Sequence, residues 1–224
     1  MSSSSLKTWI AWVAANAIGE LLGLGFVFLC GFAIHDVVGE PTSTAAILAF
    51  AAAAIALGAA EGAVVGYAQW LVLRTLLVRP VKARWVLATV IGAVIAWLLG
   101  MIPSTLGSLQ ESPMEPPPQE PSQIIVLLLA AVIGVGGGLI LSLAQWRVLR
   151  REGPGALWWL PANALAWAIG MPWIFWLVGV TVGEHQTASA YVLFVAGLGV
   201  AGALVGAVHG AFLVRVLAPK WRAA

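Results

Sequence analysis

Long apolar runs separated by short polar segments dominate this sequence. Each run is close to or longer than the ~20 residues that cross a bilayer as an α-helix. The six runs cover residues 8–34, 44–73, 85–103, 123–146, 157–182 and 188–214. The pattern predicts an all-α integral membrane protein with six transmembrane helices, in which residues 1–224 form a single membrane domain.

An internal repeat lies within these runs. The heptapeptide AQWLVLR at residues 68–74 returns as AQWRVLR at residues 144–150. Each copy closes a long apolar run with an Arg. A repeat of this kind constrains the architecture before any residue is assigned a role.

The repeat extends into both types of helix. Runs one, three and five carry a Trp followed four residues later by Asn or Thr, and runs two, four and six carry two small residues followed by a polar one. Such a spacing places these residues on one helical face, where small residues allow close packing in lipid. The units span about 7–76, 83–151 and 156–217. The sequence thus predicts three helical hairpins in the same orientation, around a pseudo-threefold axis along the membrane normal.

Composition and charge support a membrane location. Only 9% of residues are charged and 61% are hydrophobic, whereas soluble domains carry about 25% charged residues. All 11 Lys and Arg residues fall on one side of the predicted helices. By the positive-inside rule, both termini are expected in the cytoplasm, for a multi-pass protein of the bacterial cytoplasmic (inner) membrane. The basic clusters are short, so we expect no nucleic-acid partner.

The connections on the other side differ from one another. Residues 39–43 (GEPTS) predict a helix stop, a turn and an N-cap. Residues 102–122 contain five prolines between positions 113 and 121. We expect this segment to be non-helical and partly polyproline, as a solvated connector or a partner-docking segment.

Two carboxylates fall inside predicted membrane helices. Glu20 follows Lys7 by 13 residues and Glu61 precedes Arg74 by 13, so both lie ~20 Å from the basic side. Intramembrane acids are rare and are candidate functional sites. Two close carboxylates would share a proton or bind a cation. The other repeat units have no acid at these positions, although a pair of hydrogen-bonded, protonated carboxyls with a structural role remains an alternative.

A second polar set lies nearer the basic side, one residue from each predicted helix. Its members are Asn16, Gln69, Thr89, Gln145, Asn163 and His209. This polar layer would either line a cytoplasm-facing cavity or form hydrogen bonds between helices. His209 stands where the other even-numbered runs carry Gln, so we interpret it as a substitute hydrogen-bond partner.

Aromatic and metal-ligating residues predict no cofactor. Eight of the 12 Trp residues fall near the basic ends of the runs, as in an interfacial aromatic belt. They are Trp9, Trp12, Trp70, Trp85, Trp146, Trp158, Trp159 and Trp221. Trp97, Trp167, Trp173 and Trp176 are deeper, and we assign them to packing. His35 and His185 are isolated, Cys30 is the single cysteine, and no catalytic or phosphate-binding motif occurs. We therefore expect neither a metal site nor an enzyme.

Residues 66–74 (GYAQWLVLR) and 158–167 (WWLPANALAW) resemble a signature of uncharacterised bacterial multi-pass membrane proteins with repeated QWLVLR-type hairpins. The resemblance implies architecture and no activity. From the residues, we expect a permease-like protein with an intramembrane proton, cation or small-ligand site. The alternative is a non-catalytic accessory or scaffold subunit that contacts partner helices, a second copy, lipid or pigment.

Overall fold

The computed structural model describes residues 3–77, 81–110, 121–181 and 187–219. Six long helices account for most of them, and all six are long and apolar enough to cross a membrane. The helices are α1 (Ser3–Val38), α2 (Thr44–Leu73), α3 (Lys82–Gln110), α4 (Gln123–Leu149), α5 (Trp159–Thr181) and α6 (Ala188–Phe212). A short 3₁₀ helix, η1 (Ala156–Trp158), precedes α5, and a π-helical turn, η2 (Leu213–Leu217), continues α6. The protein is therefore a multi-pass, all-helical membrane protein.

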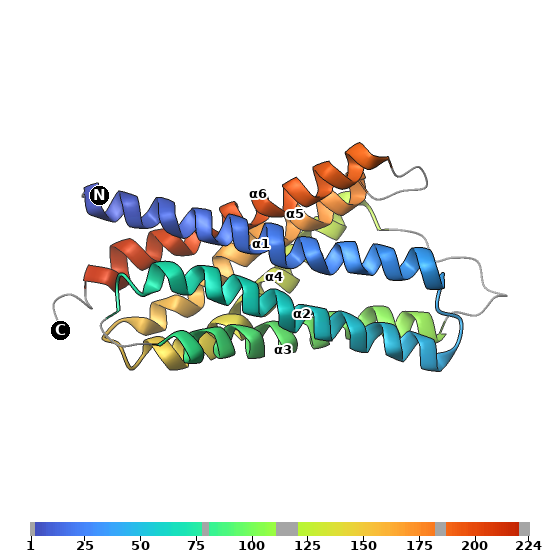
Figure 1. Ribbon diagram of the computed structural model, residues 1–224, viewed down its shortest axis with the longest axis horizontal. Coiled ribbons are helices and arrows are strands. Elements are labelled where there is room, and N and C mark those ends of the chain that lie inside the picture. Colours follow the sequence, from blue (N-terminus) through green and yellow to red (C-terminus); the bar gives the residue numbers. More distant parts are fainter. Residues whose placement is uncertain (1–2, 78–80, 111–120, 182–186, 220–224) are drawn as a thin grey trace.

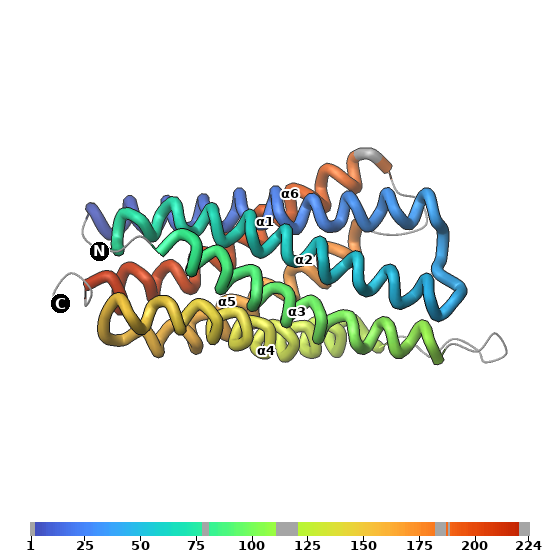
Figure 2. The backbone as a smooth tube through the Cα atoms, turned by 60° about the horizontal axis from the view of Figure 1, so that its bottom comes forward, coloured from blue at the N-terminus to red at the C-terminus, as the bar shows by residue number. Residues whose placement is uncertain are grey.

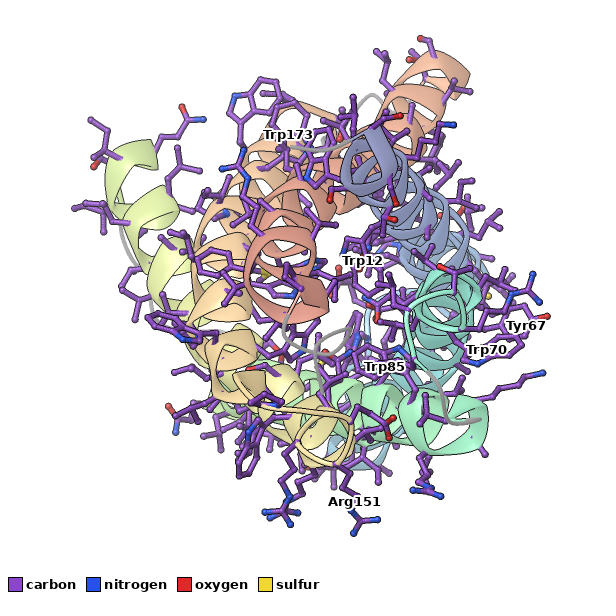
Figure 3. All side chains as sticks on the ribbon, turned by 90° about the vertical axis from the view of Figure 1, so that its left-hand side faces the viewer. Trp12, Tyr67, Trp70, Trp85, Arg151 and Trp173 are labelled. Carbon is purple, nitrogen blue, oxygen red and sulfur yellow. The ribbon has the colours of Figure 1, made fainter. Side chains whose placement is uncertain are left out.

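The helices form one elongated bundle (Figures 1 and 2). Each helix packs against its neighbours in the sequence, and α1 also packs along α6, which closes the bundle. The start of α1 and the end of α6 lie at the same end of the molecule (Figure 1). The described basic residues beside the α2–α3 and α4–α5 connections, among them Arg74 and Arg151, lie at this end too (Figures 1 and 3), and it is called the basic end below.

The outer surface of the bundle is apolar along its length. Leu22, Leu98, Leu128 and Leu193 are each about half or more exposed, as are many other Leu, Ile and Val side chains. Among the described residues, the buried positions carry apolar side chains too, together with Gly and eight polar or charged residues. An apolar surface combined with buried polar groups suits a lipid environment, where apolar side chains face the acyl chains.

Glycine brings α4 and α5 into close backbone contact. A Cβ atom at Gly134 would collide with the main-chain carbonyl of Trp167, and one at Gly138 would collide with that of Asn163. Gly134 and Gly138 are four residues apart and therefore share one face of α4. Small residues on this face allow the two helices to approach closely where lipid provides no hydrophobic force for association.

The turn between α1 and α2 follows the sequence signals. Gly39 adopts φ +76°, which favours glycine, and its N–H donates to the His35 carbonyl at 2.8 Å. The Ser43 hydroxyl then accepts from the backbone N–H of Ala46 at 3.2 Å as the N-cap of α2. The predicted stop, turn and cap are confirmed.

The prediction that residues 102–122 are non-helical is wrong for residues 102–110. Helix α3 continues to Gln110 with Pro103 inside it. Membrane helices tolerate an internal proline because neighbouring groups satisfy the freed backbone carbonyl. The four prolines between positions 113 and 118 lie outside the described residues, so the extended form predicted there stays a prediction.

Two apolar clusters occupy opposite ends of the interior. The cluster at the basic end includes Leu73, Leu149, Leu213 and three Trp residues. The cluster at the other end is built around Leu24, Ile174, Leu177, Phe194 and Leu198, with aromatic side chains packed against it. The candidate polar residues belong to neither cluster.

Candidate functional site

The structure brings the six residues of the predicted polar layer into the interior of the bundle. Each helix contributes one of them, and every one is 3% exposed or less. Buried polar groups need hydrogen-bond partners. The partners found here lie within the layer and on three neighbouring Trp residues.

In the odd-numbered helices the layer residue is tied to its own helix. Each one donates its side-chain hydrogen to the main-chain carbonyl of a Trp four residues earlier. The bonds run from Asn16 to Trp12 (2.8 Å), from Thr89 to Trp85 (3.0 Å) and from Asn163 to Trp159 (3.0 Å). These bonds fix the side-chain rotamers and leave the amide oxygens of the two Asn residues, and the hydroxyl oxygen of Thr89, as acceptors.

In the even-numbered helices the layer residue bonds across helices. Gln69 Nε2 donates to Asn16 Oδ1 at 2.9 Å, which joins α2 to α1. Gln145 Nε2 donates to Thr89 Oγ1 at 3.0 Å and to Gln69 Oε1 at 3.3 Å. A continuous hydrogen-bonded chain therefore links Asn16, Gln69, Gln145 and Thr89. In this conformation the layer joins helices and does not line an open vestibule.

Two of the three Trp residues next to the layer donate into it. Trp12 Nε1 donates to His209 Nδ1 at 2.8 Å, and Trp159 Nε1 donates to Gln145 Oε1 at 2.8 Å. Because Nδ1 of His209 accepts, its ring carries the proton on Nε2. His209 and Gln145 thus perform the same task, which matches the interpretation of His209 as a substitute partner. Trp85 Nε1 is buried and has no hydrogen-bond partner.

These three Trp residues lie near the basic end as predicted, but the prediction that they belong to an interfacial aromatic belt is wrong. Trp12, Trp85 and Trp159 are each 0% exposed, and Figure 3 shows Trp12 and Trp85 between the helices rather than on the lipid side. The Trp159 ring lies edge-on to both others, with centroids 5.9 Å from Trp12 and 6.1 Å from Trp85. A sequence signal for their burial was available. In all three odd-numbered helices a Trp precedes the buried polar residue by four positions and therefore lies on the same helical face. Trp221 lies outside the described residues.

Glu20 lies on α1, one helical turn beyond Asn16. It is 3% exposed, and its side-chain carbons pack against Gly202 of α6, where a Cβ would collide with them. Its Oε2 atom is buried without a hydrogen-bond partner. An unpartnered buried carboxyl oxygen is costly, and such a group needs an explanation.

Glu61 lies on α2 and is only partly buried. Its Oε2 accepts from Trp97 Nε1 of α3 at 2.6 Å. The glutamate also packs against Gly23 of α1, three residues beyond Glu20. The structure therefore places the two predicted acids on neighbouring helices, about one helical turn apart in depth. The role of Trp97 was missed, because no local pattern links positions 61 and 97.

Ser142 is a further buried polar residue that the sequence prediction did not single out. It is 0% exposed, and its hydroxyl donates to the Leu139 carbonyl of its own helix at 3.0 Å. It precedes Gln145 by one turn and occupies one of the two small-residue positions of α4. Its hydrogen bond is satisfied locally, so we assign it to packing.

Metal-ligating side chains do not cluster in the described part of the chain, where no group of three or more His, Cys, Asp or Glu residues occurs. His35 lies at the outer end of α1, exposed, with Nε2 3.2 Å from Glu40 Oε1. His185 and its neighbour Glu184 lie outside the described residues.

Comparisons with protein-family models, with curated proteins and with solved structures gave no match to this chain.

Proposed function

We propose that the protein is a permease-like membrane protein whose proton-binding site is the pair Glu20 and Glu61. The observation that carries the proposal is the buried carboxyl of Glu20, whose Oε2 has no hydrogen-bond partner and which lies beside a second acid. Ionisable residues are expensive within a bilayer and mark ion or proton pathways. A proton shared between the two acids satisfies the unpartnered oxygen.

The surroundings favour a proton over a larger ligand. Hard cations take six or more oxygen ligands, whereas the packing neighbours here are glycines and a Trp. One oxygen of Glu61 already accepts from the indole of Trp97, and the side chain of Glu20 is in tight contact with Gly202. A proton needs neither additional ligands nor additional space.

The polar layer and the Trp cluster separate this acid pair from the basic end. The layer supplies hydroxyl, amide and imidazole groups on the basic side of Glu20. The Trp cluster, which consists of Trp12, Trp85 and Trp159, covers the layer on the side of the basic end. We infer that the structure represents a state closed on the basic side. Opening would require separation of Trp12, Trp85 and Trp159, which exposes the layer as a lining of the proton route.

We further propose that the three hairpins are arranged around a pseudo-threefold axis. Trp12 with His209 and Trp159 with Gln145 make corresponding bonds between an odd- and an even-numbered helix. The spacing from Gln69 to Arg74 and from Gln145 to Arg150 is five residues, but His209 precedes Arg215 by six. The π-helical turn Leu213–Leu217 absorbs the extra residue, because its bonds span five residues instead of four. Within such repeats, Glu20 and Glu61 are specific to the first hairpin.

The distribution of charge supports an orientation. The basic end carries the Lys and Arg residues, so it would face the cytoplasm with both termini. We propose the bacterial cytoplasmic membrane as the location and transport, rather than catalysis, as the activity.

Proton flux into reconstituted vesicles tests the proposal. The vesicles enclose a pH-sensitive dye, and an imposed pH gradient drives the flux. We expect the parent protein to carry protons and both Glu20→Gln and Glu61→Gln to abolish the flux. Glu40→Gln removes an exposed carboxylate outside the pair and should leave it intact. An absence of flux in the parent under gradients of either sign would overturn the proposal.

A scaffold function is the second candidate, and open small-residue positions favour it. A Cβ at Gly100, Gly107, Gly136 or Gly137 would meet no atom within 4 Å. Such positions on α3 and α4 could accept helices of a partner or of a second copy. In this case Gly136→Leu and Gly137→Leu would reduce the size of the native complex in mild detergent, while proton flux would be absent from the parent.

A further inference from the structure

Two cations at the basic end share one aromatic surface. The Lys82 ammonium lies 4.8 Å from the ring centroid of Tyr67 and 4.9 Å from that of Trp70. The Arg74 guanidinium lies 5.5 Å from the same Trp70 ring. Both cations are exposed, and Tyr67 is 44% exposed. Cation–π contacts thus hold two like charges at one corner of α2 and α3.

In the described part of the chain, no ion pair joins Arg74 or Lys82 to an acid. The ion pairs of His35 with Asp36 and Glu40 lie at the opposite end of the bundle. Two like charges near one aromatic ring repel each other, and an anion bound beside them relieves this repulsion. We therefore expect this corner to attract a negatively charged group.

The helices that form this corner also present apolar faces to the membrane. On α2, Val64 and Leu71 are exposed and lie one turn on either side of Tyr67. On α3, Leu87 and Ile91 are exposed beyond Lys82. Figure 3 shows Tyr67 and Trp70 at the outer edge of α2. A ligand at this corner would thus contact basic groups at one end and apolar surface along its length.

We propose that Tyr67, Trp70, Arg74 and Lys82 form a binding site for the phosphate of an anionic phospholipid, with its acyl chains along α2 and α3. Basic groups near a membrane surface attract anionic lipids, and pockets between helices bind their headgroups. The apolar faces favour a lipid over a free phosphate ion. The corner at Trp146 has a single stacked cation, Arg150, at 5.0 Å, and we assign no such site to it.

Native mass spectrometry of the detergent-purified protein tests this site. Phosphatidylglycerol is titrated against the parent and the variants Lys82→Gln and Arg74→Gln, with phosphatidylcholine as the neutral lipid. We expect each variant to weaken phosphatidylglycerol binding about fivefold, as removal of one membrane-proximal charge predicts. Lys82→Arg keeps the charge and should bind phosphatidylglycerol as tightly as the parent does. Arg150→Gln removes the same charge at the same end and should leave binding nearly unchanged.

Three results would overturn the site. Equal loss in Arg150→Gln would mean general surface attraction, and equal binding of phosphatidylcholine would mean that the headgroup charge is not recognised. Full competition by inorganic phosphate would mean a free-anion site without a role for the acyl chains. Unchanged gel-filtration profiles of the variants separate lost binding from lost folding. The outcome is independent of proton flux.

Discussion

Trp97 donates its indole N–H to Glu61 Oε2 at 2.6 Å and thereby ties α3 to the acid pair on α1 and α2. The Trp97 ring also packs on Gly58, where a Cβ would collide with the indole. The ring is one of the partly buried side chains against the outer apolar cluster. The acid pair is thus held in place by α3, a helix that contributes no carboxylate to the pair.

Replacement of Trp97 by Phe should destabilise the protein through Glu61. The ring stack on Gly58 is largely kept, but the partly buried carboxyl loses its indole donor, at a cost of about 1–3 kcal/mol. Thermal unfolding in detergent measures the change. The control Trp158→Phe alters a Trp that is 52% exposed and should have little effect.

A double-mutant cycle makes this prediction specific. If the N–H acts through Glu61, Trp97→Phe should cost much less in a Glu61→Leu background, which has no acceptor, with an interaction energy of about 0.5–3 kcal/mol. Additive effects of the two substitutions would show that the hydrogen bond contributes nothing and that Trp97 acts by packing alone.

The packing of Glu20 depends on the absence of a side chain at position 202. A Cβ on Gly202 would collide with the main-chain carbonyl of Asn16 and lie 2.8 Å from the side-chain carbons of Glu20. Gly202→Ala should therefore push α6 away from α1, at a cost of about 1–3 kcal/mol. Gly137→Ala adds the same methyl group where no atom lies within 4 Å, and thermal unfolding should be nearly unchanged. Equal effects of the two substitutions would contradict the close contact.

Much of this arrangement was predictable from the sequence, because it is periodic. Six apolar runs of sufficient length predict the six helices, and one polar residue at the same register of each run predicts a layer. The depth of Glu20 and Glu61 follows from their distance to the basic residues. These inferences need only helical geometry and charge placement.

The remaining features depend on side-chain direction, which residue type alone does not give. Trp12 and Trp85 lie at the depth of an interfacial belt but point inward, and Trp70 at a similar depth points outward (Figure 3). The continuation of α3 through Pro103 to Gln110 was missed for a different reason. The proline and the polar residues after it are typical of a helix end. The residues from 104 to 110 contain no further proline, so nothing there prevents the helix from continuing.

His209 and Gln145 should be interchangeable as acceptors for a Trp indole. His209→Gln keeps an acceptor for Trp12 Nε1, whereas His209→Leu leaves this buried donor unpaired, at a cost of about 1–3 kcal/mol. We expect the Leu variant to unfold at a clearly lower temperature and the Gln variant to stay close to the parent. Equal loss in both variants would show that the imidazole ring is needed for packing beside Trp12 and Trp159.

The three buried Trp residues should differ in their response to replacement by Phe. All three lose similar ring area, but Trp12 and Trp159 also lose an indole bond of 2.8 Å and leave His209 Nδ1 or Gln145 Oε1 without that donor. Trp85→Phe removes a buried N–H that has no partner, which offsets part of the packing loss. Trp12→Phe and Trp159→Phe should therefore destabilise the protein by about 1 kcal/mol more than Trp85→Phe, measured by thermal unfolding in one detergent. A loss in Trp85→Phe as large as in Trp159→Phe would show that the Trp85 N–H is bonded in solution, and Gln69 would be the first acceptor to test by Gln69→Leu.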